Sequence, residues 1–124
     1  MPHRSDSEVE FHRALLRKNK IIEINQGKQN TFNFWVLPTG IQRQGERIEL
    51  DFLILHQGQW IAVEIDGSSH LNKYHFDEEA RLENLRNNFL DIRRVRPDYL
   101  DPHWAQTEVD LLFNYLEIRR RAGK

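Results

Sequence analysis

The chain has 124 residues, 39% of them hydrophobic, which suits one compact domain over residues 1–124 and argues against disorder. It has no cysteine, which excludes a disulfide framework, a thiol nucleophile and cysteine-bound metal centres. The net charge of −1 excludes a strongly basic nucleic-acid binder, and the short apolar runs and leader-free start predict a cytoplasmic protein without membrane contact.

The first third of the chain predicts a helix followed by short strands. Ser7 and Glu10 read as a capping box that opens a helix, ahead of apolar residues at helical spacing. The apolar run over residues 21–24 is a strand candidate, and a polar loop over 25–30 follows it. Residues 31–37 are rich in aromatic and β-branched side chains, so we expect a strand there.

The centre of the chain predicts a β-hairpin. Apolar and polar residues alternate over 48–55, and alternation resumes over 60–66. The four residues 56–59 form the expected turn, so Leu55 faces Trp60. This register fixes which side chains oppose one another along both strands.

The last part predicts a helix, a strand and a final helix. The first helix runs from about Phe76 or Asp77 to Asn88, and the strand covers 92–96. Asp101 and Pro102 favour the start of the last helix, as N-cap and first helical residue. The residues expected to point inward on that helix are Trp104, Leu111, Leu112, Tyr115 and Ile118. This element order predicts an α/β (mixed α+β) domain with helices packed on a small sheet.

The hairpin register brings four acids together. It places Asp51 opposite Glu64 and Glu49 opposite Asp66, with all four on one side of the hairpin. Directly opposed like charges are destabilising, and a divalent cation would relieve the repulsion. The alternative is that the acids are solvated or paired with nearby arginines. We favour the metal for Asp51 and Glu64, which lie between apolar residues, and the alternative for Glu49.

These residues resemble a known family. Asp51-Phe52, followed by Glu64-Ile65-Asp66-Gly67 and then His70, is similar to the PD-(D/E)xK nuclease superfamily. More narrowly, it resembles small domains related to very-short-patch-repair endonucleases. The likeness covers about residues 7–100 and includes Ser7-Glu8 in the first helix and the arginine-rich stretch 91–96.

The resemblance implies a restriction-endonuclease-like core of order αβββαβα, a central mixed sheet flanked by helices. It implies Mg²⁺-dependent hydrolysis of a phosphodiester in double-stranded DNA, with Mn²⁺ as a substitute. Asp51 and Glu64 would hold the ion, together with the backbone carbonyl of Ile65. Glu8 would orient a metal-bound water or assist a second ion. The alternative is that Glu8 has no role at the site and only stabilises the first turn of the helix through the helix dipole.

One residue departs from the superfamily pattern. Asp66 stands where a lysine is usual, although the narrower family also has aspartate there. His70 is the first substitute for activating water, and Lys73 is another. The alternative for His70 is a loop histidine that bonds to the backbone. Asp66 is itself a candidate catalytic residue or metal ligand.

Basic residues near the site are candidate contacts to DNA phosphates: Arg43, Lys73, Arg81, Arg93, Arg94 and Arg96. Trp35, Trp60 and Trp104 are expected in the core rather than as base-stacking platforms. A lone domain would nick DNA, whereas a two-fold homo-oligomer could cut both strands. Two other readings stay open: an inactive DNA-binding or assembly module on the same fold, and a small metal-binding or structural domain without nucleic acid.

Overall fold

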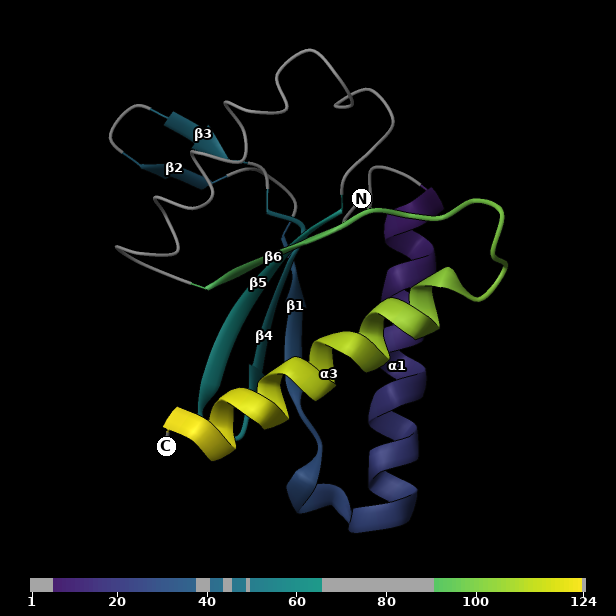
Figure 1. The fold of residues 1–124 in the computed structure, drawn as a ribbon, viewed down its shortest axis with the longest axis vertical. Helices are drawn as coiled ribbons and strands as arrows, with labels where there is room; N and C mark the ends of the chain where they lie inside the picture. Colours follow the sequence, from purple (N-terminus) through teal and green to yellow (C-terminus); the bar gives the residue numbers. More distant parts are fainter. Residues whose placement is uncertain (1–5, 38–40, 44–45, 49, 66–90, 124) are drawn as a thin grey trace.

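A computed structural model describes residues 6–37, 41–43, 46–48, 50–65 and 91–123 of the chain, with the backbone alone at 41–43 and 46–48. The described elements are α1 (Asp6–Gln26), the 3-10 helix η1 (Lys28–Asn30), β1 (Asn33–Val36), β2 (Ile41–Arg43), β3 (Glu46–Ile48), β4 (Phe52–His56), β5 (Gln59–Ile65), β6 (Ile92–Val95) and α3 (Trp104–Gly123), shown in Figure 1. The helix predicted to end at Asn88 lies outside these residues.

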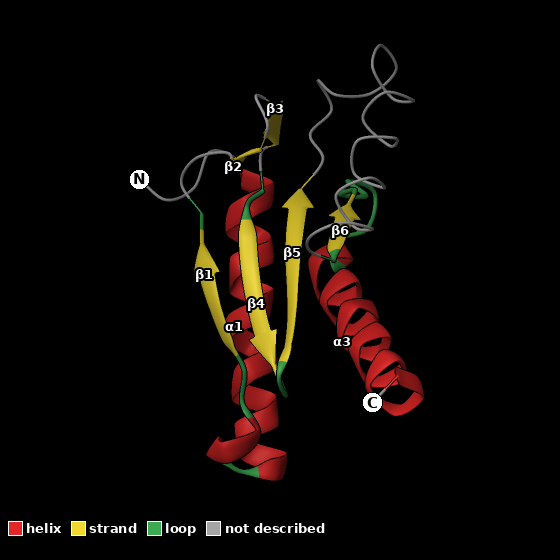
Figure 2. Ribbon diagram, turned by 90° about the vertical axis from the view of Figure 1, so that its left-hand side faces the viewer, coloured by secondary structure: helices red, strands yellow, loops and turns green. Residues whose placement is uncertain are grey.

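The sheet has four strands in the order β1-β4-β5-β6. The β1–β4 and β4–β5 pairs are antiparallel, and β6 runs parallel to β5. Strands β2 and β3 form a separate two-stranded sheet. The predicted mixed α+β class is confirmed: Figure 2 shows a mixed four-stranded sheet accompanied by α1 and α3. None of the helices within the described ranges is long and apolar enough to cross a membrane.

The predicted strand over 21–24 is wrong, because α1 continues unbroken to Gln26. Ile22 lies seven residues, two helical turns, after Leu15, and both are buried on the same side of the helix. Ile21 and Ile24 are exposed. A run this short does not distinguish strand from helix by its pattern alone.

The predicted capping role of Ser7 is also wrong. Asp6 already belongs to α1, so Ser7 lies within the first turn rather than before it. Its hydroxyl oxygen is 3.0 Å from the hydroxyl oxygen of Tyr99, and the Ser7 residue is buried. Ser7 therefore fastens the start of α1 to the segment between β6 and α3. The Asp101 carboxylate accepts a hydrogen bond from the backbone N–H of His103 at 2.9 Å, as a capping residue would. The predicted helix start is two residues too early, however, because α3 begins at Trp104 and Pro102 is not its first residue.

The predicted hairpin register is confirmed by the pairing of Leu55 with Trp60 and of Phe52 with Val63. The turn is tighter than expected, because β4 extends to His56 and β5 begins at Gln59. The two remaining residues have positive φ angles, 52° at Gln57 and 76° at Gly58. Positive φ at both central residues matches the right-handed twist of the two flanking strands.

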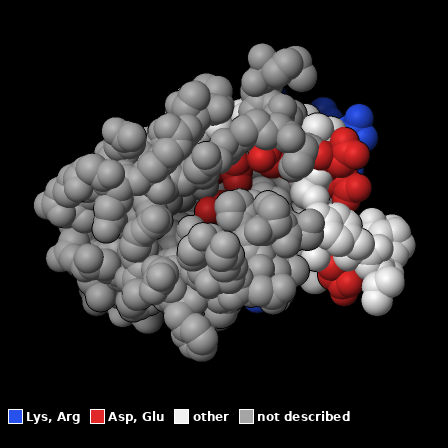
Figure 3. All heavy atoms as spheres, turned by 90° about the horizontal axis from the view of Figure 1, so that it is seen from above, with Lys and Arg blue, Asp and Glu red and all other residues white. Residues whose placement is uncertain are grey.

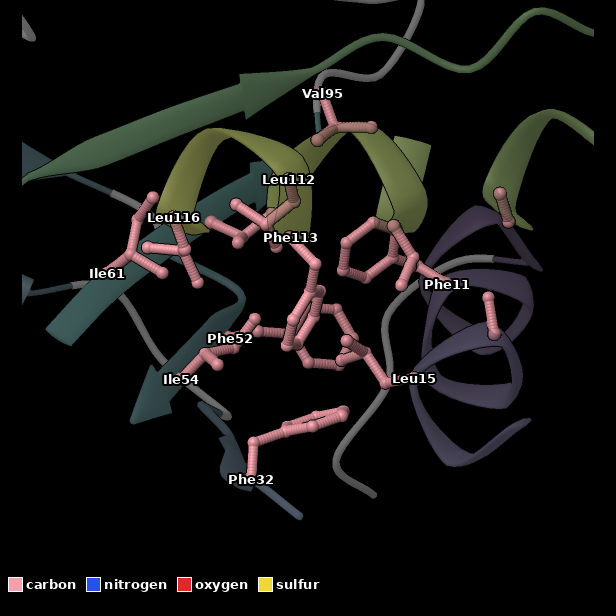
Figure 4. Packing of buried hydrophobic residues seen from close by; sticks show 14 of the residues in the cluster. Phe11, Leu15, Phe32, Phe52, Ile54, Ile61, Val95, Leu112, Phe113 and Leu116 are labelled. Atoms are coloured by element: carbon pink, nitrogen blue, oxygen red, sulfur yellow. The ribbon is translucent and has the colours of Figure 1, made fainter. Parts of the chain in front are cut away.

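The main core lies between the sheet and the two helices. Figure 4 shows side chains from α1, β4, β5, β6 and α3 meeting there, including Phe11, Phe52, Ile61, Val95 and Leu116. The rings of Phe11 and Phe52 are 5.2 Å apart, so the first helix packs directly on the central strand. Apolar residues alternate along β4 and β5 because one sheet face meets this core.

The other face of the sheet carries a smaller cluster. Leu50, Ala62 and Ile92 are buried there, with Leu37 and Leu53 packed against them. The prediction that all three tryptophans lie in the core is wrong for two of them. Trp104 is buried, whereas Trp35 and Trp60 are each 45% exposed and stack on one another with ring centroids 5.7 Å apart.

The inward side of α3 also differs from the prediction. Trp104 and Leu112 are buried as expected, but Leu111, Tyr115 and Ile118 are exposed. The residues that fill the remaining inward positions are Ala105, Val109, Phe113 and Leu116. Apolar residues thus occupy two sides of α3, and only one of these two sides faces the core.

His56 lies in an apolar setting at the end of β4. Its ring packs edge-on against Phe113, with centroids 5.2 Å apart, and lies 6.1 Å from the ring of Phe32. Burial lowers the pKa of His56 below its ordinary value, Arg120 and Lys18 lower it further, and Glu117 acts in the opposite direction. The folded chain therefore favours the neutral imidazole.

The turn makes a stability prediction. Replacing Gln57→Asn should raise the free energy of unfolding by about 0.5–1 kcal/mol, because asparagine adopts positive φ more readily than glutamine. Gly58→Ala should lower it by about 1 kcal/mol, although the added methyl group meets nothing within 4 Å. Urea unfolding of the two variants measures both changes, and equal stability of the two would contradict the turn geometry.

His56 makes a prediction about pH. Because its pKa is lowered in the folded state, the unfolded chain binds more protons, and stability should fall as pH drops below the ordinary range of histidine. The thermal midpoint of the wild type should therefore decrease between pH 7.5 and 5.5. His56→Phe should reduce this decrease, because the buried imidazole that the unfolded chain protonates is then gone. An identical pH dependence in His56→Phe and wild type would refute the assignment.

Candidate functional site

The acids buried within the described ranges are Glu8, Asp51 and Glu64, with 6%, 3% and 8% of each residue exposed. They come from three elements: the first turn of α1, the residue before β4, and the penultimate residue of β5. All three were predicted site residues. Burying an ionised carboxylate is costly unless a partner compensates the charge, so these positions need a physical explanation.

The three acids lie toward one end of the molecule. In Figures 1 and 2 this is the end at which α1 begins and β5 ends. Figure 3 views the molecule from this end and shows acidic side chains within the part of the face that the described residues form. The buried acids therefore lie at the end of the sheet where the site was predicted.

Asp51 is fixed by both its backbone and its carboxylate. Its N–H donates to the carbonyl of Val63 at 2.8 Å, and its carbonyl accepts from the N–H of Leu37 at 2.9 Å. Its carboxylate oxygen Oδ2 accepts a buried hydrogen bond from the N–H of Ile65 at 2.7 Å. That N–H belongs to the peptide bond joining Glu64 to Ile65. The Asp51 carboxylate is therefore held against the backbone that carries the second predicted ligand.

Glu64 lies beside an arginine from the neighbouring strand. Parallel pairing of β5 and β6 sets Glu64 next to Arg94. Nε of Arg94 is 3.6 Å from Oε1 of Glu64, and the two side chains are only 6% and 11% exposed. This distance is a charge contact rather than a direct hydrogen bond. The guanidinium compensates much of the charge that burial of Glu64 would otherwise leave unopposed.

Glu8 occupies the first turn of α1, three residues before Phe11. The contact of Phe11 with Phe52 brings this helix against the strand that follows Asp51. Across the described residues, however, no group of three or more histidines or acids is arranged to hold one metal ion. Glu8 is thus buried at the same end as Asp51 and Glu64 without joining them in a three-residue cluster.

Five of the predicted site residues lie wholly or in part outside the described residues. Asp66, His70, Lys73 and Arg81 lie outside the described residues, as does the side chain of Arg43 in β2. Ile65, whose carbonyl was a predicted ligand, is the last residue of β5.

The predicted DNA contacts on β6 and directly after it lie in three different environments. Arg94 is buried against Glu64, and Arg93 is half-buried with its guanidinium carbon 6.0 Å from the ring centroid of Tyr115. Arg96 is exposed. A residue that contacts a phosphate must reach the protein surface, and of these three side chains Arg96 is the exposed one.

A cavity with charged walls was not predicted from the sequence. It has a volume of about 250 Å³ and lies between α1 and the start of α3, where its lining includes Glu10, Arg13, Arg17 and His103. Arg17 also donates to the side-chain carbonyl of Gln106 at 3.1 Å. Spacing of four residues along α1 places Arg13 and Arg17 on one side of the helix, which is the signal that sequence reading could have used.

No protein-family model matches this chain, and no curated protein matches it.

The Glu64–Arg94 pair makes a stability prediction. Arg94→Met removes the guanidinium and leaves a buried acid beside an apolar side chain, which should cost about 3 kcal/mol. Adding Glu64→Gln should recover part of that loss, because the buried charge is then gone. Urea unfolding of the two single variants and the double variant measures the coupling. The exposed Arg96→Met is the matched control, and strictly additive effects at 64 and 94 would contradict a coupled pair.

Proposed function

We propose that the chain is a Mg²⁺-dependent endodeoxyribonuclease of the restriction-endonuclease-like fold, which hydrolyses a phosphodiester bond in double-stranded DNA. The observation that carries the proposal is the fixed position of Asp51, whose buried carboxylate is hydrogen-bonded to the amide between Glu64 and Ile65. The family resemblance identifies the same acids as metal ligands. The described order, with β5 antiparallel to β4 and parallel to β6, agrees with the mixed sheet that this fold requires.

The donor groups suit the proposed metal. Mg²⁺ prefers oxygen ligands and is commonly held by one or two carboxylates, with water and substrate phosphate completing its coordination. Asp51 and Glu64 supply the carboxylates, and the Ile65 carbonyl is an additional oxygen on the same strand. When bound, the metal would activate water and neutralise charge on the phosphate.

The residues of the chain have distinct roles in this proposal. The hydrogen bond from Ile65 holds Asp51 in one orientation, so the carboxylate need not be ordered when substrate arrives. Glu8 is buried at the same end and would orient water at the site. Arg96 is exposed on the chain just after β6, where it would neutralise a DNA phosphate. His70 and Lys73 remain the candidates for proton transfer in place of the usual lysine.

Arg94 has a different role from the one first proposed for it. Its guanidinium lies beside Glu64 and is almost fully buried, so it supplies positive charge within the site rather than on the DNA-facing surface. This placement favours one orientation of Glu64 and offsets the repulsion between Glu64 and Asp51. A cation at this point also adds to the field that would stabilise negative charge on a phosphate.

The experiment is a cleavage assay with supercoiled plasmid and short DNA duplexes in Mg²⁺ or Mn²⁺, with a chelator as the metal-free arm. Wild type should nick the plasmid only with metal. Asp51→Asn and Glu64→Gln should each reduce the rate by about 100-fold or more, because each removes a charged ligand while keeping the side-chain shape. Asparagine at 51 also retains an oxygen that can accept the bond from Ile65.

Asp98→Asn is the matched control, because Asp98 is an exposed acid whose side chain bonds to the backbone of Leu100, a bond that asparagine can also make. It should cut at the wild-type rate. Metal-dependent binding without cleavage would favour the inactive DNA-binding module. Absence of both binding and cleavage would leave the small structural domain, and full activity of Asp51→Asn would refute the site.

A further inference from the structure

Helix α3 carries a second apolar stripe, formed by Leu111, Tyr115 and Ile118, that does not face the core. The spacing of four and three residues places them on one side of the helix. Their exposed fractions are 46%, 37% and 67%. Aligned apolar residues on a helix that already buries another side indicate a contact surface rather than scattered exposure.

The aromatic ring at the centre of this stripe is held in place. The Tyr115 hydroxyl donates to the carboxylate of Asp91 at 2.6 Å. Arg119 is ion-paired to the same carboxylate, and its guanidinium carbon is 5.4 Å from the Tyr115 ring centroid. A ring ordered in advance loses little conformational entropy when a partner packs on it. Tyrosine is also among the residues that contribute most at protein interfaces.

The charges along α3 suggest which partner fits. The half before Tyr115 carries two acids, Glu108 and Asp110, of which Asp110 is ion-paired to Lys18 of α1, so Glu108 gives this half its acidic excess. The half after Tyr115 carries Arg119, Arg120 and Arg121, of which Arg119 is paired with Asp91. The acid in this second half, Glu117, is bound by Arg120 and Arg121, so the half keeps a basic excess. Two such helices side by side in the same direction would place like charges together. In opposite directions, each acidic half meets a basic half, and the helix dipoles are also opposed favourably.

We propose that this stripe is the interface of a homodimer in which the α3 helices of two copies pack antiparallel about a two-fold axis. A two-fold interface requires a surface that is complementary to itself, and a helix with one acidic and one basic half meets this requirement. The axis passes close to Tyr115, so that Leu111 of one copy faces Ile118 of the second copy. The proposal does not depend on nuclease activity, although such a dimer would carry two copies of the candidate site.

The first test measures mass in solution against protein concentration, by sedimentation or light scattering. The wild type should form a dimer at micromolar concentration. Ile118→Asp should weaken dimerisation by roughly 100-fold, because it introduces a charge into the apolar interface twice, once from each copy. Ile24→Asp is the matched control: Ile24 is 71% exposed on α1, close to the 67% of Ile118, and its replacement should leave the dimer intact.

The second test uses the absence of native cysteine, so that introduced thiols are the only ones present. Oxidising a mixture of Leu111→Cys chains and Ile118→Cys chains should give disulfide-linked heterodimers. Leu111→Cys alone should cross-link poorly, because in the antiparallel arrangement the two copies of residue 111 are about 10 Å apart along the helix axis. Thermal unfolding and circular dichroism of each variant establish that it is folded.

Three results would overturn the proposal. The wild type could remain a monomer at protein concentrations of hundreds of micromolar. The apolar stripe would then be covered by another protein or by another segment of the chain, and not by a second copy of α3. Folded Ile118→Asp could dimerise as tightly as wild type, which would place the interface elsewhere. Leu111→Cys could cross-link to itself more efficiently than to Ile118→Cys, which would show that the helices are parallel.

Discussion

The described structure depends most on how the chain accommodates a carboxylate at Asp51. This residue lies where three strands meet: its backbone bonds to Leu37 beyond β1 and to Val63 in β5, and its side chain bonds to Ile65. Burying a carboxylate is costly unless donors compensate it, and the bond from Ile65 is one such donor. The same bond holds the Asp51 carboxylate against the strand of Glu64. One interaction therefore contributes both to the stability of the sheet and to the geometry of the candidate site.

The features that sequence reading predicted correctly are governed by local pattern. The hairpin register followed from strict alternation and a short turn, and it was right because a one-residue slip would expose Phe52 and Ile61. The errors arose where apolar residues exceeded the needs of one face. Ile21 and Ile24 suggested a strand but belong to a helix, and Leu111 and Ile118 suggested core positions but are exposed. Local pattern identifies apolar residues, whereas tertiary contacts decide which of them are covered.

As with the fold, the sequence predicted some features of the candidate site and missed others. Charged residues within apolar strands marked Asp51 and Glu64, and both are buried at the expected end of the sheet. The partner of Glu64 could not be inferred, because Arg94 is thirty positions away in the chain and reaches it only through the parallel pairing of β5 with β6. Burial beside Glu64 distinguishes Arg94 from the exposed Arg96, although both were among the six basic residues predicted to contact DNA. The sequence pattern identifies the acids Asp51 and Glu64, whereas only the strand pairing identifies Arg94 as the cation beside them.

This pairing changes the meaning of a net charge near zero. A chain that binds DNA through surface charge needs a basic excess, which this one lacks. Here one arginine is used inside the molecule to offset a buried acid, and Arg119 is used to fasten α3 to Asp91. Fewer cations are then available on the surface than the sequence count indicates. Under the proposed function, affinity for DNA would come from a few positioned groups, such as Arg96, and from a metal shared between carboxylates and phosphate. Binding of that kind would be sensitive to both salt and metal, because salt screens the cation–phosphate contacts and removal of the metal takes away the shared ion.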